Sequence, residues 1–192
     1  MMKHSYLFLA PGFEEIEGLT TVDVMRRAGM DVKTVAVNDT DSVTGAHGVT
    51  VTADMNIRDV DDVDVEWLIL PGGMPGAENL VKCEKLCGML TRHNAAGGKI
   101  AAICASPAVV LAPLGILDGR EATCYPGFER MCDKAVMRDT PVMALDTVVT
   151  GNGPAASLRF ALAIVASSMG ESIAREVGGG MLFYPASAKF YF

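Results

Sequence analysis

Several kinds of signal are missing from this 192-residue sequence, and each absence excludes a class of protein. Basic residues are few, because 16 Lys and Arg stand against 23 Asp and Glu, which gives a net charge of −7. Nucleic-acid binding needs a clustered basic surface, and the densest basic spot is only Arg26-Arg27. Two prolines and one glycine interrupt the most apolar stretch, 101–117, which is shorter than the roughly 20 residues that span a bilayer. We therefore expect neither a nucleic-acid partner nor a membrane span.

The sequence also lacks the common motifs of cofactor and metal sites. It contains no GxxxxGK[ST] phosphate loop, no GxGxxG after the first predicted strand and no GxSxG of a serine hydrolase. The three histidines, His4, His47 and His93, lie far apart and form no HExxH motif. No CxxC pair suggests a structural zinc site. We therefore expect no cofactor and no bound metal.

Cysteines are too few and too irregularly placed for a disulfide scaffold. There are five, and an odd number argues against a complete disulfide framework. The apolar run near the N-terminus is too short for a signal peptide and ends at Pro11-Gly12. We therefore expect a cytoplasmic protein, in a reducing compartment. The five residues are Cys83, Cys87, Cys104, Cys124 and Cys132.

What the sequence does contain is an alternation of short apolar runs with helical periodicity. Strands are predicted at 6–9, 32–37, 67–70, 99–103 and within 142–150, with a small β excursion at 44–53. Helices are predicted at 14–28, 80–96, 107–117, 154–169 and 173–177. This alternation favours one doubly wound α/β domain over 1–192, with a mostly parallel sheet and helices on both faces. The aromatic tail, 187–192, is expected to pack on the body or on a partner.

In such a fold, ligands bind beyond the carboxyl ends of the strands, and Cys104 lies at such a position. The apolar run 100–103 precedes it, and Ala105-Ser106-Pro107 opens the next predicted helix. A strand-to-helix turn displays its residue above the sheet, as in the nucleophile elbow of α/β-hydrolases. Because a helix N-terminus favours the thiolate, we expect a reactive Cys104 with a lowered pKa. The alternative is an ordinary buried core cysteine.

Two further segments near strand ends carry chemically useful groups. Glycines in Pro71-Gly72-Gly73 let backbone N–H groups approach closely, where they could stabilise an oxyanion or a cysteine oxide, although a plain turn is the alternative. Glu17 follows the apolar Ile16, and a carboxyl drawn into a packed site can hold a proton near neutral pH. Such a group would donate or shuttle protons beside a thiolate. From the residues alone, an ordinary acidic first helical turn is the simpler interpretation.

Taken together and in this order, these segments resemble the ThiJ/PfpI family. The resemblance is closest to its parkinsonism-associated deglycase branch and the bacterial relatives of that branch. The match extends over about residues 5–178, and the combination of segments is specific although each one alone is weak. The main stretches are EEIE at 14–17, LPGG at 70–73, AAICASP at 101–107 and Gly153-Pro154.

The resemblance implies a flavodoxin-like α/β sandwich that is usually a homodimer and needs no cofactor or metal. It implies that Cys104 is the reactive cysteine at a strained elbow and that Glu17 is the buried acid hydrogen-bonded to it. Gly73 and Ala105 would donate backbone N–H groups to the site. The substrate pocket would include Gly72, Tyr125 and Pro154.

Two positions depart from the pattern of that branch. Tyr125-Pro126 stands where the branch often has His-Pro, so no imidazole base comes from that position. This departure disfavours a Cys-His triad of the peptidase or glutamine-amidotransferase kind. Gly153-Pro154-Ala155-Ala156 replaces a typical Gly-Pro-Gly-Thr, which alters a wall of the pocket.

Two functions use the same cysteine and carboxyl. In the first, the Cys104 thiolate attacks a reactive aldehyde such as methylglyoxal, and Glu17 moves protons until lactate leaves. The protein is then a glyoxalase or deglycase type of hydro-lyase or hydrolase. In the second, Cys104 is oxidised to a sulfinate in a non-enzymatic stress sensor or chaperone, and protonated Glu17 hydrogen-bonds the oxide. The expected partner is accordingly a small aldehyde or an oxidant.

Overall fold

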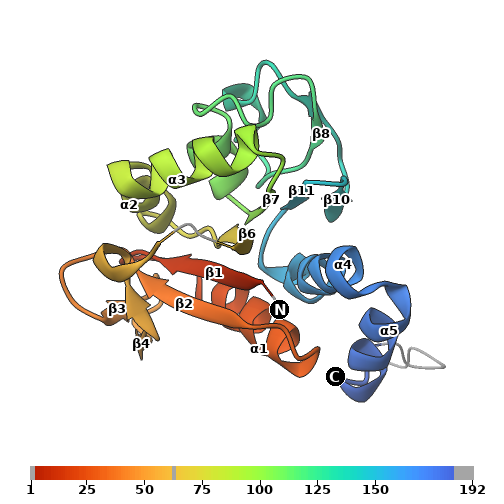
Figure 1. Ribbon diagram of the computed structural model, residues 1–192. Coiled ribbons are helices and arrows are strands. Elements are labelled where there is room, and N and C mark those ends of the chain that lie inside the picture. Colours follow the sequence, from red (N-terminus) through yellow and green to blue (C-terminus); the bar gives the residue numbers. More distant parts are fainter. Residues whose placement is uncertain (1–2, 62–63, 184–192) are drawn as a thin grey trace.

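The fold is built on a seven-stranded sheet, seen in a computed structural model that describes residues 3–61 and 64–183 (Figure 1). The strand order is β10-β11-β7-β6-β1-β2-β5, and every neighbouring pair is parallel except β10 with β11. This is the mostly parallel, flavodoxin-like sheet that the sequence predicts. Its strands are β1 (His4–Leu9), β2 (Val32–Ala36), β5 (Met55–Asn56), β6 (Val65–Leu70), β7 (Lys99–Ile103), β10 (Val142–Ala144) and β11 (Val148–Gly151).

Helices cover both faces of this sheet. Figure 1 shows α2 (Gly76–Val81) and α3 (Glu84–Ala95) on one face, and α1 (Glu15–Arg27), α4 (Ser157–Met169) and α5 (Glu171–Gly180) on the other. Short pieces complete the chain. They are the hairpin β3 (Ser42–Thr44) with β4 (Thr50–Thr52), the pair β8 (Glu121–Ala122) with β9 (Val136–Met137), and the one-turn elements η1 (Ile57–Asp59), η2 (Pro107–Leu111), η3 (Glu129–Met131) and η4 (Pro154–Ala156).

The sheet separates two apolar cores. Alternate residues of a strand point to opposite faces, so Leu7 and Leu9 of β1 pack with α1 and α4, while Phe8 packs with α2 and α3. The strands are apolar throughout because both of their faces are buried. Burial of this kind fixes the carboxyl ends of β1, β6 and β7 side by side at one edge of the molecule.

One predicted helix, 80–96, is in fact two. The chain breaks after Val81, and Cys83 has an extended backbone (φ −81°, ψ 99°) that begins α3. Six residues turn a straight helix by about 240°, which would point Leu80 and Leu86 in different directions. The break lets both side chains enter the same core, where both are fully buried.

The predictions for 107–117 and 173–177 also need correction. Only Pro107–Leu111 is helical, as one turn of π-helix with Ala112 N donating to Pro107 O at 2.9 Å, and turns follow because Pro113 lacks an N–H. In contrast, α5 is longer than expected and includes the glycines at 178–180. Its buried residues Ala174 and Gly178 are four apart, so small side chains form one face of this helix.

Two other expectations concern membranes and the C-terminus. Within residues 3–61 and 64–183, no helix combines the length and the apolar character needed to cross a bilayer. The aromatic tail at 187–192 lies outside the described residues.

Candidate active site

Cys104 occupies a strained turn at the end of β7. Its φ is +63°, a left-handed conformation that residues other than glycine rarely adopt. Two backbone hydrogen bonds hold it there, because Cys104 N donates to Gly151 O at 2.9 Å and Tyr125 N donates to Cys104 O at 2.8 Å. The Ser106 hydroxyl also donates to Pro71 O at 2.5 Å and ties this turn to the loop after β6. Its surroundings therefore impose this conformation on Cys104, a residue of which only 8% is exposed.

Glu17 reaches the same place from the first turn of α1. Glu14 caps this helix and accepts a hydrogen bond from Glu17 N at 2.7 Å. The Glu17 side chain is completely buried, and its Oε2 accepts a hydrogen bond from Gly72 N at 2.7 Å. Its other oxygen, Oε1, has no hydrogen-bond partner within the described part of the chain. The carboxyl therefore makes one backbone hydrogen bond, to Gly72, and otherwise interacts with the Cys104 thiol.

Gly72 lies between these two side chains. A Cβ atom at this position would be 2.6 Å from Cys104 Cβ and 2.9 Å from Glu17 Oε2. No residue with a side chain fits there without displacing one of them. Gly73 follows with φ +88°, and the backbone N–H groups of Gly73 and Ala105 act to lower the pKa of the Cys104 thiol. The structure thus brings together five residues singled out in the sequence: Glu17, Gly72, Gly73, Cys104 and Ala105.

Burial raises the pKa of both titratable groups. Burial, with a smaller contribution from the Glu14 charge, raises the pKa of Glu17 to about 7, although hydrogen bonds from Gly72 and Cys104 oppose it. Burial, the Glu17 charge and the Glu17 hydrogen bond raise the pKa of Cys104 to about 12, against the opposing N–H groups of Gly73 and Ala105. Near neutral pH, Glu17 is therefore close to half protonated beside a protonated thiol.

The expected lowering of the Cys104 pKa is therefore wrong. That expectation depended on the N-terminus of a long helix, but Cys104 precedes only the five-residue π turn. So short an element carries little dipole, and desolvation dominates. The arrangement instead supplies a proton acceptor of suitable pKa directly beside the thiol, so that the thiolate can form as the sulfur attacks.

Tyr125 is hydrogen-bonded to Cys104 through its backbone, and its ring borders Gly153, the residue before Pro154. The Tyr125 ring is 45% exposed and packs edge-on against Phe128 at a centroid distance of 6.2 Å. It also borders Gly153, where an added Cβ would meet Tyr125 Cδ2 at 3.4 Å. Tyr125 therefore adjoins the Gly153-Pro154 segment, while its own backbone N–H binds the Cys104 carbonyl.

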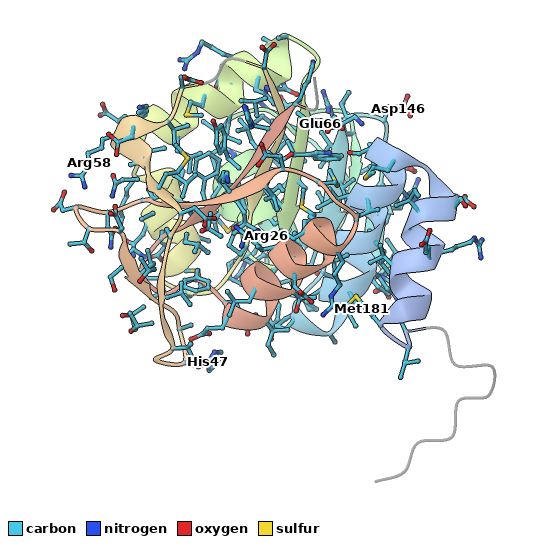
Figure 2. The ribbon with its side chains drawn as sticks, turned by 60° about the horizontal axis from the view of Figure 1, so that its bottom comes forward. Arg26, His47, Arg58, Glu66, Asp146 and Met181 are labelled. Carbon is cyan, nitrogen blue, oxygen red and sulfur yellow. The ribbon has the colours of Figure 1, made fainter. Side chains whose placement is uncertain are left out.

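The three acidic residues within 14–17 have three different roles, which the sequence alone did not distinguish. Glu14 caps α1 and Glu17 enters the site, whereas Glu15 accepts hydrogen bonds from His47 N at 2.7 Å and from His47 Nδ1 at 2.8 Å. Figure 2 shows His47 at the tip of the β3–β4 hairpin. Hydrogen bonding to His47 and Val49 lowers the pKa of Glu15 despite burial, and the Glu15 contact raises that of His47.

Among the described residues, one group of three side chains has its ligand atoms close enough together to hold a metal ion. The ligand atoms of Glu14, Glu15 and His47 lie within 4.8 Å of one another. Both Glu15 oxygens already accept hydrogen bonds from the hairpin, and Glu14 Oε2 already binds Glu17 N. These contacts indicate that the three residues attach the β3–β4 hairpin to α1.

Comparison with known proteins places these features in a family. The family model described as DJ-1/PfpI matches residues 3–167. Protein DJ-1 homolog B of Arabidopsis thaliana is 34% identical over 184 residues, and the match covers 95% of this chain but 42% of the plant protein. This chain thus spans less than half the length of that relative, and the same is true of homolog A, of which 46% is covered.

Other relatives match over most of their length. The glutathione-independent glyoxalase DJR-1.2 of Caenorhabditis elegans is 35% identical over 165 residues, which are 85% of this chain and 87% of that protein. The solved structure of oxidized Toxoplasma gondii DJ-1 is 36% identical with a TM-score of 0.89, and covers 94% of this chain and 98% of that one.

The packing around Gly72 predicts the effect of a single methyl group. Gly72→Ala should lower the free energy of unfolding by about 1–3 kcal/mol, because the added atom must displace Cys104 or Glu17. Gly179→Ala is the matched control, since it lies in α5 with nothing within 4 Å of the added Cβ, and should be neutral or slightly stabilising. Urea denaturation measures both variants. Equal stabilities would contradict the close approach at Gly72.

Proposed function

The chain belongs to the DJ-1/PfpI family, and we propose that it consumes small reactive aldehydes without a cofactor, as a glyoxalase or deglycase type of enzyme. Methylglyoxal would be converted to lactate. The observation that carries this proposal is the buried Glu17 carboxyl, which interacts with the Cys104 thiol and has a pKa near 7. A relative named as a glutathione-independent glyoxalase adds support.

The first step is the addition of the thiol to the aldehyde. The Cys104 sulfur attacks the carbonyl carbon while Glu17 takes the thiol proton and delivers it to the carbonyl oxygen, which gives a hemithioacetal. Glu17 then takes the C–H proton of the former aldehyde carbon and delivers it to the neighbouring carbon, while the hydroxyl proton passes to the oxygen of that neighbouring carbon, which leaves a lactoyl thioester on Cys104. Water releases lactate and restores the thiol, so the sum is methylglyoxal plus water to lactate. Removal of early glycated adducts would follow from the same aldehyde chemistry.

We assign the role of base to Glu17 because the histidines are engaged elsewhere. His4 contacts Asp31, His47 contacts Glu15, and the His93 ring lies 3.1–3.2 Å from two backbone carbonyl oxygens. Tyr125 stands where a peptidase-like member would carry an imidazole. A Cys-His peptidase mechanism is therefore disfavoured, and Tyr125 and Pro154 are proposed to contact the substrate at the margin of the site.

A second function has one specific observation in its favour. Glu17 Oε1 lacks a partner among the described residues, and a protonated carboxyl there could donate to an oxygen bound to Cys104. Cys104 would then be oxidised to a sulfinate, and the protein would act as an oxidative-stress sensor or chaperone. The solved Toxoplasma gondii relative is itself an oxidized form. Both functions suit the cytoplasm, where the free cysteines stay reduced.

The proton-transfer role predicts opposite effects of Glu17→Gln on two rates. The amide cannot carry the proton, so methylglyoxal turnover should fall by about 10²-fold or more. The same change removes a negative charge that raises the pKa of Cys104, so alkylation of Cys104 by iodoacetamide at pH 8 should become faster. A merely structural role for Glu17 would slow both reactions or neither.

Cys104→Ala is the reference for both measurements. Lactate should form with the unmodified chain and not with Cys104→Ala. Turnover no greater than that of Cys104→Ala would reject the enzyme and leave the sensor. Turnover that survives in Glu17→Gln would reject Glu17 as the proton carrier while keeping Cys104 as the nucleophile.

We also propose that the protein is a homodimer, joined through the exposed side of α1. Ile16 and Leu19 lie three residues apart on this helix and are 57% and 40% exposed. Val49 is 49% exposed, and its backbone N–H contacts Glu15 of the same helix. Apolar side chains gathered in this way favour burial against a second copy.

This interface predicts that Leu19→Arg produces a monomer. A charged side chain in the middle of the apolar surface would have to be buried without a partner in the dimer. Met169→Arg is the matched control, because Met169 is 38% exposed but lies at the end of α4. Light scattering after size exclusion measures the mass. A dimer that persists in Leu19→Arg, or one lost equally in Met169→Arg, would exclude this surface.

A further inference from the structure

Ser106 is a completely buried serine whose hydroxyl does not serve its own helical turn. It occupies the N-cap position of η2, where a serine side chain commonly accepts a hydrogen bond from the backbone of the helix that it begins. Among the residues that the structure describes, no such bond forms, and the hydroxyl instead donates to Pro71 O at 2.5 Å. The side chain therefore joins two loops, the turn after β7 and the loop after β6.

The Pro71 carbonyl belongs to the peptide unit whose N–H contacts Glu17. A peptide unit is planar, so fixing its oxygen also fixes the direction of its N–H. The oxygen of the Pro71–Gly72 unit accepts the hydrogen bond from Ser106, and the Gly72 N–H of the same plane donates to Glu17 Oε2 at 2.7 Å. The Ser106 hydroxyl thus holds one end of a plane whose other end binds the buried carboxyl.

The next peptide unit repeats this arrangement with different partners. Its carbonyl, Gly72 O, accepts a hydrogen bond from Glu14 N at 3.0 Å. Its N–H, that of Gly73, acts to lower the pKa of the Cys104 thiol. Two consecutive planes are therefore held at their oxygens by donors from other segments, while their N–H groups act on the two titratable side chains of the site. Of the two donors, Ser106 is the one that uses a side chain, so a substitution can remove it.

The hydrogen bond from Ser106 also has an electrostatic consequence. A hydrogen bond to a carbonyl oxygen polarises the amide and makes its N–H a better donor, and the effect is larger away from water. Ser106 and Glu17 are both completely buried. The hydrogen bond from Gly72 lowers the pKa of Glu17 against the larger effect of burial. By strengthening that bond, the Ser106 hydroxyl favours the ionised form of Glu17, which is the form that accepts a proton.

We propose that Ser106 is a positioning residue, which acts through the Pro71–Gly72 peptide plane to orient and polarise the backbone donor that binds Glu17. This inference deepens the proposed function and, where it concerns turnover, rests on it. The simpler alternative is that Ser106 only satisfies a buried carbonyl, as most buried carbonyls require. That alternative predicts a loss of stability without any change in the titration of Glu17.

The titration of Glu17 in Ser106→Ala separates these two roles. Isotope-edited infrared spectroscopy of glutamate-labelled protein follows the carboxylic-acid C=O band that is missing in Glu17→Gln. We expect the midpoint of this band to move upward by about 0.5 pH unit in Ser106→Ala, because a weakened Gly72 donor stabilises the carboxylate less. The titratable groups that act on Glu17, which are Cys104 and Glu14, are unchanged in this variant.

Ser5→Ala is the matched control. Ser5 is 1% exposed, and its hydroxyl has no hydrogen-bond partner in the described part of the chain. It lies near the amino end of β1, whereas the site lies beyond the carboxyl ends of the strands. This variant loses a buried hydroxyl without altering the Pro71–Gly72 plane, so its midpoint should equal that of the unmutated chain. Should Ser106→Ala not fold, Ser106→Cys allows the same comparison with the same sign, because a thiol is a weaker donor than a hydroxyl.

Turnover of methylglyoxal provides a second readout. An upward shift of Glu17 by about 0.5 pH unit leaves about threefold less carboxylate at pH 6 and almost the same amount at pH 9. Ser106→Ala should therefore lose about threefold in kcat at pH 6 and little at pH 9, with KM unchanged. An unchanged midpoint in Ser106→Ala, or an equal shift in Ser5→Ala, would overturn the proposal. Because the midpoint is measured without substrate, an unmutated chain that fails to consume methylglyoxal would reject the proposed function and leave this inference intact.

Discussion

The candidate active site depends on one constraint: a carboxyl and a thiol are buried together. Glu17 and Cys104 are both withdrawn from water, and neither ionises at its usual pH as a result. The cost of placing negative charge at this point keeps the thiol protonated and Glu17 about half protonated near neutral pH. The reactivity that we propose for them therefore depends on desolvation and contact, without any need for a permanently charged nucleophile.

The scaffold explains how two such groups are held so close. Glu17 is positioned by the capped first turn of α1, and Cys104 by a left-handed turn anchored to Gly151 and Tyr125. Gly72, at the end of β6, is the spacer that permits their approach. These elements meet because β1, β6 and β7 are neighbours in a parallel sheet whose two faces are fully covered. The buried parallel sheet thus holds the strained turn at Cys104 in place.

Much of this could be predicted from residue patterns, for identifiable reasons. The buried strands are continuous apolar runs, and a cysteine directly after one of them at a strand-to-helix turn indicates a displayed side chain. Glu17 could be told apart from Glu14 and Glu15 only through the family resemblance, because three acids in one helical turn have the same composition whichever of them is buried. The direction of the Cys104 pKa could not be predicted, since it depends on desolvation and on the length of the helix that follows.

The central claim is that Glu17 holds its proton up to neutral pH. Isotope-edited infrared spectroscopy of glutamate-labelled protein can follow the carboxylic-acid C=O band of this residue, identified as the band missing in Glu17→Gln. The account predicts that this band disappears with a midpoint near pH 7. A midpoint near the ordinary value of 4.5 would show an unperturbed carboxylate at pH 7 and would contradict the account.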